Sequence, residues 1–156
     1  MDKELTIRYS EYAKASDLTP SDRELAEAAE RSAQFAYAPY SHFKVGAAVR
    51  LSDGRIVCGN NQENAAYPSG LCAERTALFA ASAQYPDADG YDAIAIVGID
   101  AEGHRCEASP CGACRQVVAE YEQRQRRGIR VLCCNADGGA RVFGSVRDLL
   151  PFGFEF

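Results

Sequence analysis

The sequence has no long hydrophobic run, and this absence argues against two classes of protein. No stretch of about 18 consecutive apolar residues occurs in the chain, so no transmembrane helix is predicted. The first residues, Met1–Leu5, are charged and have no apolar core, unlike a secretory signal peptide. We therefore expect a cytoplasmic protein with no membrane partner.

An excess of basic charge is also missing. The chain has 22 acidic and 17 basic residues, which gives a formal net charge of −5 at pH 7. A protein that binds duplex DNA or transfer RNA is expected to have a basic surface, so the charge favours a small-molecule substrate over nucleic acid. The basic residues that do cluster fall at the predicted end of a helix, where cations complement the helix dipole; they are Arg124, Arg126, Arg127 and Arg130.

Internal repeats, low-complexity tracts and linkers are absent as well, and 156 residues suit one domain. We expect a single domain over residues 21–156, preceded by an N-terminal extension of residues 1–20. In this extension Leu5, Ile7 and Tyr9 alternate weakly with polar residues. The alternation is compatible with a short edge strand or with a segment that lies loosely on the body.

Local signals predict the first elements of the domain. A capping box at Ser21–Glu24 begins a helix whose buried stripe is mostly alanine, and Pro39 closes it. Asp53-Gly54 predicts a hairpin turn between antiparallel strands over residues 43–51 and 55–60.

Two later helices are predicted to begin at cysteines. One helix of about a dozen residues starts at Cys72, and Pro86 marks its end. The other runs from Cys111 to about Arg127, with Gly128 as its C-terminal cap. A helix N-terminus carries positive partial charge, which lowers the pKa of a thiol and favours the thiolate that a metal binds.

Continuous apolar runs predict the centre of the sheet. Ala93–Ile99 is typical of a strand covered on both faces, and Arg130–Cys134 is another apolar strand. The helix between them implies a right-handed parallel crossover. A second hairpin leads to Arg141–Phe143, and Ser145 caps a short final turn. The expected fold class is α/β, a three-layer α/β/α sandwich around a mixed sheet of about five strands.

Cysteine is abundant, and the number is odd, at seven. Without a predicted export signal, metal binding or burial explains these residues better than disulfides. Cys133 and Cys134 end an apolar run and are expected in the core, whereas Cys58 and Cys106 have no partner at ligand spacing and are expected to be ordinary thiols.

The three remaining cysteines form a metal-ligand pattern with a glutamate. Cys72 is followed two residues later by Glu74, and Cys111 and Cys114 belong to a Pro-Cys-x-x-Cys segment. Three soft ligands and a free carboxylate are typical of a catalytic zinc whose fourth position is open to water. The same arrangement is the signature of zinc deaminases that act on cytosine or adenine. We predict one zinc ion per chain.

Glu74 is the predicted catalytic acid and base. In a deaminase it takes a proton from the attacking water, protonates the ring nitrogen and passes a proton to the departing amino group. Arg75, about one helical turn after Cys72, is predicted to donate hydrogen bonds to thiolate sulfur and so to restore the Lewis acidity that three thiolates reduce. Arg115 is a less telling candidate for the same role.

Four segments resemble the small cytidine deaminases of pyrimidine-nucleoside salvage: Tyr40–Ala48, Asn61–Ala65, Cys72–Ala77 and Ser109–Gln116. The similarity runs from about Ser21 to about Phe154. It implies zinc-dependent hydrolytic deamination of cytidine, and of 2′-deoxycytidine, to the uracil nucleoside and ammonia. It also implies a homotetramer with active sites at the subunit interfaces.

The resemblance also implies a set of substrate-binding residues. In this chain they are Phe43, Asn61, Glu63, Ala65, Ala66, Tyr67, Ala73 and Phe154. Asn61 and Glu63 hydrogen-bond the ribose, Phe43 lies against the base, and backbone groups of the alanines read the pyrimidine edge. Phe154 occupies the position of a C-terminal aromatic residue that reaches a neighbouring subunit's site. From the residues alone, Asn61–Asn64 can equally be an ordinary polar loop. A lone phenylalanine that begins a strand, such as Phe43, is more often a core residue.

Other functions stay open at this point. A non-enzymatic zinc domain needs a fourth protein ligand, and neither His42 nor His104 has a suitable spacing. A redox pair of Cys111 and Cys114 leaves Cys72 and Glu74 without a role. Within the deaminases, another aminopyrimidine, in a nucleoside antibiotic or a polynucleotide, is the nearest alternative, and the acidic charge disfavours the polynucleotide.

Overall fold

The computed structural model describes residues 1–155, so Phe156, the last residue of the predicted domain, lies outside the described residues. The strands are β1 (Tyr9–Lys14), β2 (Lys44–Leu51), β3 (Ile56–Asn60), β4 (Tyr91–Ile99), β5 (Arg105–Cys106), β6 (Arg130–Cys134) and β7 (Gly138–Phe143). The α-helices are α1 (Pro20–Ala33), α2 (Ala73–Gln84) and α3 (Gly112–Gln125). Short 3₁₀ turns lie at Ala15–Asp17, Tyr67–Ser69 and Val146–Asp148.

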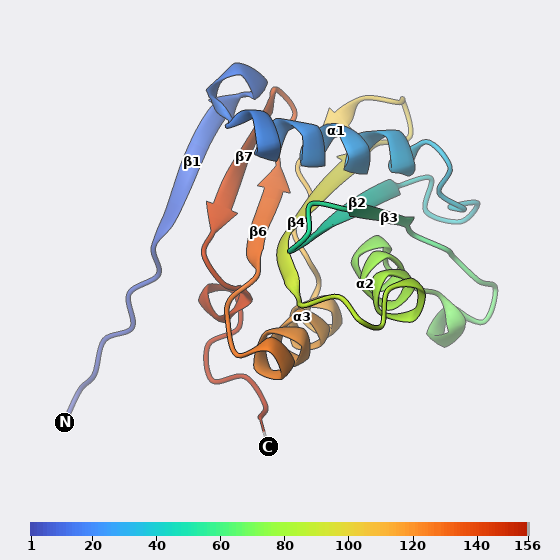
Figure 1. Ribbon diagram of the computed structural model, residues 1–156. Coiled ribbons are helices and arrows are strands. Elements are labelled where there is room, and N and C mark those ends of the chain that lie inside the picture. Colours follow the sequence, from blue (N-terminus) through green and yellow to red (C-terminus); the bar gives the residue numbers. More distant parts are fainter. Residues whose placement is uncertain (156) are drawn as a thin grey trace.

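The strands form one mixed sheet in the order β1-β7-β6-β4-β2-β3, with β5 paired to β4. The β4–β6 pair is parallel, as the crossover through α3 requires, and the other pairs in the described residues are antiparallel. Helix α1 covers one face of the sheet, and α2 and α3 cover the other (Figure 1). The predicted three-layer α/β/α sandwich is confirmed, but the sheet has seven strands where about five were expected.

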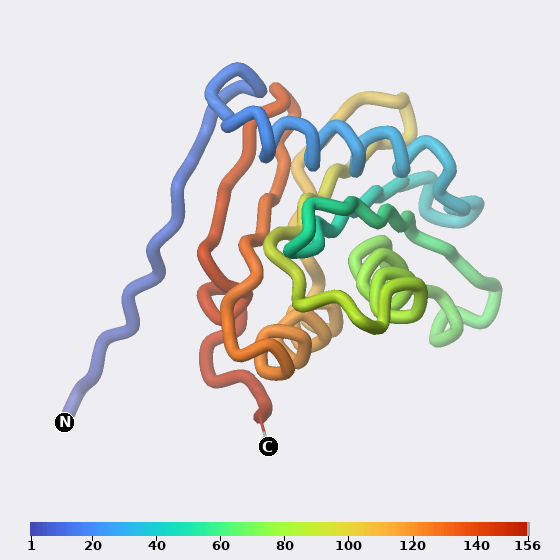
Figure 2. Tube along the Cα trace, viewed as in Figure 1, coloured from blue at the N-terminus to red at the C-terminus, as the bar shows by residue number. Residues whose placement is uncertain are grey.

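The additional strands are β5, which has two residues, and β1, which comes from the N-terminal extension. Strand β1 pairs with β7 from Tyr9 to Lys14, and the Tyr9 ring lies 5.4 Å from that of Phe143 between centroids. Of the two alternatives for the extension, residues 9–14 therefore adopt the edge strand. The residues before Tyr9 run away from the body as an extended segment (Figure 2). The domain boundary at residue 20 stays a prediction.

Two predicted helix caps are wrong. Thr19, not Ser21, caps α1, and its hydroxyl accepts the Asp22 N–H at 3.2 Å, because Pro20 takes the first helical position that proline favours. The C-cap of α3 is Arg126, in the left-handed region at φ 57°, rather than Gly128. A Cβ atom at Gly128 would lie 2.9 Å from the Gly144 carbonyl oxygen, so this glycine serves a close approach of two loops. Helix α1 also ends at Ala33, well before Pro39.

Apolar side chains are buried on both faces of the central strands. On the α1 face, Leu25 and Ala29 belong to one core with Ala95, whereas on the other face Leu78 and Val118 belong to a second core with Ile96. Cys133 and Cys134 are buried in opposite cores, as predicted. This alternation explains why β4 is apolar throughout: each successive residue enters one core or the other.

Two arginines of the cluster, which spans the end of α3 and the start of β6, are paired with acidic residues. Arg130 makes two hydrogen bonds, of 2.8 and 2.7 Å, to the buried carboxylate of Asp22 in α1. Arg127 Nη2 lies 2.8 Å from Asp92 Oδ1. These two pairs neutralise part of the positive charge and connect elements far apart in sequence. No helix in residues 1–155 is both long and apolar enough to cross a membrane.

A glycine in β2 sets the distance between the sheet and α1. A Cβ atom at Gly46 would lie 1.9 Å from the Ala29 carbonyl oxygen and 2.6 Å from the Ala33 nitrogen. Because both contacts are helix backbone, Gly46→Ala must displace α1, and we expect it to lower the free energy of unfolding by about 2 kcal/mol or more. Urea denaturation measures this change. Gly144→Ala is the control, because no atom lies within 4 Å of its added Cβ, and equal stability of the two variants would contradict the prediction.

Candidate active site

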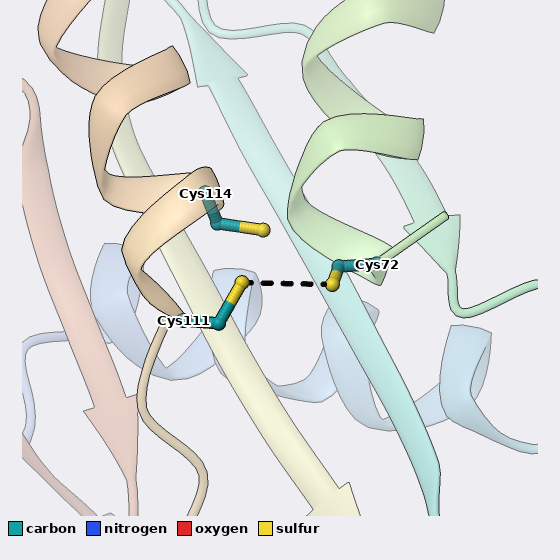
Figure 3. Close-up of side chains that lie close together, drawn as sticks. All are labelled: Cys72, Cys111 and Cys114. Atoms are coloured by element: carbon teal, nitrogen blue, oxygen red, sulfur yellow. Dashed lines mark hydrogen bonds between the residues drawn. The ribbon is translucent and has the colours of Figure 1, made fainter. Parts of the chain in front are cut away.

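The starts of two helices bring three cysteines together. Cys72 and Cys111 are the N-cap residues of α2 and α3, one residue before each helix, and Cys114 lies in the first turn of α3. Both helices pack on the same face of the sheet (Figure 1). Their N-termini converge, and the three side chains point their sulfur atoms toward one another (Figure 3). The two helix starts expected from the sequence are confirmed to within one residue.

The sulfur positions fit a single metal ion. The Sγ atoms of Cys72 and Cys111 are 3.7 Å apart, and all three Sγ atoms lie within 4.8 Å of one another. Tetrahedral zinc with Zn–S bonds of about 2.3 Å places sulfurs about 3.8 Å apart. In residues 1–155 no other group of three or more His, Cys, Asp or Glu side chains is close enough to hold an ion. No fourth such side chain joins the group, which argues against a purely structural zinc.

Hydrogen bonds to sulfur stabilise a thiolate at Cys72. Hydrogen bonding to Cys114, with further bonds from Arg75 and Cys111, lowers the pKa of Cys72 to about 5. Hydrogen bonding to Cys72, together with burial, raises the pKa of Cys114. Arg75 Nη2 lies 3.3 Å from the Cys72 Sγ and adds to the stabilisation of the thiolate there. Metal binding requires all three thiols to deprotonate.

The two arginines next to the cysteines differ in their contacts. Arg75 donates to sulfur, as the sequence predicted. Arg115 instead donates to two backbone carbonyls, with Nε 2.8 Å from Pro110 O and Nη1 2.7 Å from Leu149 O. Arg115 therefore holds the turn before Cys111 against the C-terminal segment, and neither of these two hydrogen bonds goes to one of the three sulfurs.

Glu74 lies in the first turn of α2 and is 4 % exposed. Burial, with the negative charge of Cys72 adding to it, raises the pKa of Glu74 to about 7. A carboxyl group with such a pKa exchanges a proton readily near neutral pH, as a general acid and base must. The side chain is close to the sulfurs and is not part of the metal-binding group.

Two adjoining cavities open at this point. The first, the metal cavity, has a volume of about 310 Å³, and its walls include Phe43, Asn61, Cys72, Ala73, Glu74 and Cys111. The second, the loop cavity, has a volume of about 510 Å³, and its walls include Tyr40, Ser41, Asn61, Glu63, Tyr67, Cys72 and Arg75. Because Asn61 and Cys72 line both cavities, the two lie next to each other beside the sulfurs.

The structure gathers most of the predicted substrate-binding residues at these cavities. Phe43, 38 % exposed, lines the metal cavity and is not a core residue. The alanines of the 61–67 loop, Ala65 and Ala66, are exposed and line neither cavity. Phe154 also lines neither cavity of its own chain, and its carbonyl oxygen accepts a hydrogen bond from Gln116 Nε2 at 3.2 Å. The binding roles of all these residues stay predictions.

Several wall residues were missed from the sequence. Ser109 lines the metal cavity, and its position just before Pro110-Cys111 was a usable signal. Glu107 lines the same cavity and pairs with Arg141 of β7, a long-range contact without a local signal. Tyr40 and Ser41 line the loop cavity. They begin the first of the four segments that resemble the family, and this position was a usable signal.

Comparison with known proteins gives consistent results. The family model described as the cytidine and deoxycytidylate deaminase zinc-binding region matches residues 19–127. A cytidine deaminase of Halalkalibacterium halodurans is 44% identical over 119 residues, which are 76% of this chain and 83% of that protein. One of Sporosarcina psychrophila is 48% identical over 92 residues, 59% of this chain and 63% of that protein. That second match therefore spans less than two thirds of the relative's length.

A solved structure also matches almost the whole fold. The 1.6 Å crystal structure of cytidine deaminase from Burkholderia pseudomallei aligns with a TM-score of 0.74 and 44% sequence identity. The alignment covers 88% of this chain and 100% of that one. The similarity therefore extends beyond the zinc-binding segments to the arrangement of the sheet and helices.

Proposed function

The chain belongs to the cytidine and deoxycytidylate deaminase family, and on this basis we propose that it is a zinc-dependent enzyme that hydrolyses cytidine and 2′-deoxycytidine to the uracil nucleoside and ammonia. The observation that carries the proposal is the convergence of three sulfurs at two helix N-termini beside a buried carboxyl group. The named relatives support cytidine as the substrate.

Cys72, Cys111 and Cys114 are the proposed zinc ligands, with one ion per chain. The positive ends of α2 and α3 stabilise negative charge near the sulfurs, and the guanidinium of Arg75 favours the thiolate at Cys72. A zinc ion bound by these residues supplies a Lewis acid that makes a water molecule nucleophilic at neutral pH.

Glu74 carries the protons. Its carboxylate accepts a proton from the water that attacks C4, and the resulting acid protonates the neighbouring ring nitrogen. Glu74 then takes the remaining proton from the hydroxyl group now on C4 and delivers it to the amino group, so that the C4 carbonyl forms as the C4–N bond breaks and ammonia leaves. The pKa of about 7 caused by burial suits both halves of this cycle.

The cavities suggest how the nucleoside is oriented. The base occupies the metal cavity, where Phe43 lies against the ring and the backbone at Ala73 reads its edge. The sugar extends past Asn61 into the loop cavity toward Glu63 and Tyr67. Because Asn61 lines both cavities, it marks the junction between base and sugar.

A homotetramer completes the proposed sites. Ala65 and Ala66 are exposed, and Phe154 is 67 % exposed and lines neither the metal cavity nor the loop cavity. In the proposed assembly Phe154 reaches a neighbouring subunit's active site. Light scattering of the purified protein tests the tetramer. The place of this reaction in pyrimidine salvage and in the cytoplasm is proposed from the family resemblance.

Two measurements test the proposed activity together. Zinc analysis under reducing conditions should find one ion per chain, and cytidine should be converted to uridine with loss of ultraviolet absorbance and release of ammonia. A protein that binds zinc and converts none of a panel of aminopyrimidine nucleosides and oligonucleotides would instead be a non-enzymatic zinc protein. A zinc-free protein with a reversible Cys111–Cys114 disulfide would support the redox alternative.

Arg75 offers a separate test of the electrostatics. Its hydrogen bond to Cys72 withdraws charge from the sulfur, so Arg75→Leu should lower kcat about 10–100-fold with zinc still bound. Arg31→Leu is the matched control, because Arg31 is exposed on α1 and pairs only loosely with Glu27, at 4.0 Å. An unchanged kcat in the Arg75 variant would show that the contact with sulfur has no catalytic effect.

A further inference from the structure

We propose that Ser41 is a positioning residue for sugar recognition: its hydroxyl group orients the Glu63 carboxylate, and this orientation determines how strongly the enzyme prefers nucleosides that carry sugar hydroxyls. The inference rests on the proposed function and adds a residue that acts on substrate only through Glu63.

Three donors from one short segment converge on the Glu63 carboxylate. Oε2 accepts the backbone N–H groups of Tyr40 at 2.9 Å and Ser41 at 3.3 Å. Oε1 accepts the Ser41 hydroxyl. The Ser41 hydroxyl, followed by the backbone N–H groups, lowers the pKa of Glu63, so the group is an ionised, pure acceptor at neutral pH.

The contacts leave one acceptor position for a ligand. An ionised carboxylate offers about four lone-pair sites, and on Glu63 two donors occupy Oε2 and one occupies Oε1. The remaining site is on Oε1, the oxygen that Ser41 holds. Because Glu63 lines the loop cavity, a hydroxyl donor on the substrate sugar suits this site.

Ser41 also connects Glu63 to the base end of the site. Its Oγ accepts the N–H of Phe43 at 3.1 Å, while it donates its single proton to Glu63. On the other side of Phe43, its carbonyl oxygen accepts Asn61 Nδ2 at 3.0 Å, and Asn61 Oδ1 accepts the Val45 N–H at 2.7 Å. Residues 41, 43, 61 and 63 thus form one hydrogen-bonded network that spans both cavities.

The network explains why Ser41 affects the orientation of the Glu63 carboxylate more than it affects the stability of the fold. The terminal torsion of a glutamate is broad, so the orientation of the carboxylate plane is set by the hydrogen bonds to its two oxygens. Without the Ser41 hydroxyl, the two backbone donors still bond to Oε2 and the loop connection remains. Only one oxygen is then restrained, so the carboxylate plane moves more widely about these contacts and the free acceptor on Oε1 no longer points consistently at the sugar.

The test compares nucleosides with and without the 2′- and 3′-hydroxyls of the sugar. For Ser41→Ala we expect KM for cytidine to rise about tenfold, the effect of weakening one hydrogen bond to a charged group, with kcat changed little. KM for 2′,3′-dideoxycytidine should stay near its wild-type value, so the preference between the two substrates falls about tenfold. 2′-Deoxycytidine and 3′-deoxycytidine identify which hydroxyl is involved. Ser10→Ala, an exposed serine of β1, is the control.

Two further variants separate positioning from a general structural role. Ser41→Thr keeps the hydroxyl and should restore the wild-type preference. In a Glu63→Gln background, Ser41→Ala should have no additional effect on the preference. If Ser41→Ala does not retain zinc, Ser41→Gly is measured in its place with the same expectations.

The outcomes distinguish this inference from the proposed function. The role of Ser41 alone is overturned if the wild-type enzyme deaminates cytidine but Ser41→Ala changes KM equally for both substrates or for neither. Wild-type enzyme that releases no ammonia from any nucleoside overturns the proposed function, and with it the inference. The inference is supported if Ser41→Ala loses the preference, Ser41→Thr keeps it, and Ser41→Ala causes no additional loss in the Glu63→Gln background.

Discussion

Glu74→Gln is expected to reduce ammonia release from cytidine about 10⁴-fold, the upper range for general acid–base catalysis, without loss of zinc. Glutamine preserves the size of the side chain but neither accepts nor donates a proton as a carboxyl group does. Zinc should remain bound because Glu74 does not belong to the group of three cysteines that could hold the ion. Steady-state kinetics and zinc analysis of the same preparation measure both quantities.

Two comparisons make the Glu74 result specific. Glu120→Gln changes an exposed glutamate of α3 and should leave both activity and zinc content unchanged. Thermal unfolding should show that Glu74→Gln is at least as stable as wild type, because neutralising a buried carboxyl group removes a desolvation cost. Substantial turnover by Glu74→Gln would remove Glu74 from the proton-transfer mechanism.

Cys111→Ser is expected to abolish zinc binding and activity together. Serine is a poor zinc ligand because its hydroxyl is not deprotonated at neutral pH, so two thiolates would remain where three are needed. Cys111 is exposed, which means that the substitution opens no cavity in the core and its effect reports on the metal. Zinc content should fall well below one ion per chain, and activity should fall with it.

The same variant should also lose stability. With zinc bound, the N-termini of α2 and α3 are tied together by one ion, and binding free energy of this kind adds to folding free energy. A chelator added to the wild-type protein should reproduce the loss. Cys58→Ser, another exposed thiol, is the matched control and should retain zinc. Full zinc content in Cys111→Ser would show that the ion is held elsewhere.

Local patterns predicted the chemistry well for a physical reason. A cysteine two residues before a glutamate and a Cys-x-x-Cys at a helix start place their groups within one helical turn, so their relative positions depend only on nearby backbone. The start of α1 was misplaced because Thr19 and Ser21 both lie near the N-terminus of the helix, and the proline between them favoured Thr19. The Arg75 contact was predictable because it joins residues three apart.

Long-range contacts were beyond such reasoning. The pairing of β1 with β7 joins residues at opposite ends of the chain, and a weak alternation of Leu5, Ile7 and Tyr9 did not choose between an edge strand and a loose segment. The network of Ser41 and Glu63 joins residues 22 apart, and no periodicity links them. Glu107 became a wall residue only because the loop before Cys111 turns toward β7.

The amino-acid sequence by itself determined the donor set, the helix starts that carry it and the presence of a free carboxyl group, because each depends on neighbours within about four residues. Only the tertiary structure decided that the Sγ atoms of Cys72 and Cys111, which are 39 positions apart in the sequence, lie 3.7 Å apart. It also decided that Glu74 is buried enough to raise its pKa to about 7. Distance between remote segments and exclusion of water are properties of the packed sheet and helices, and no single segment encodes them.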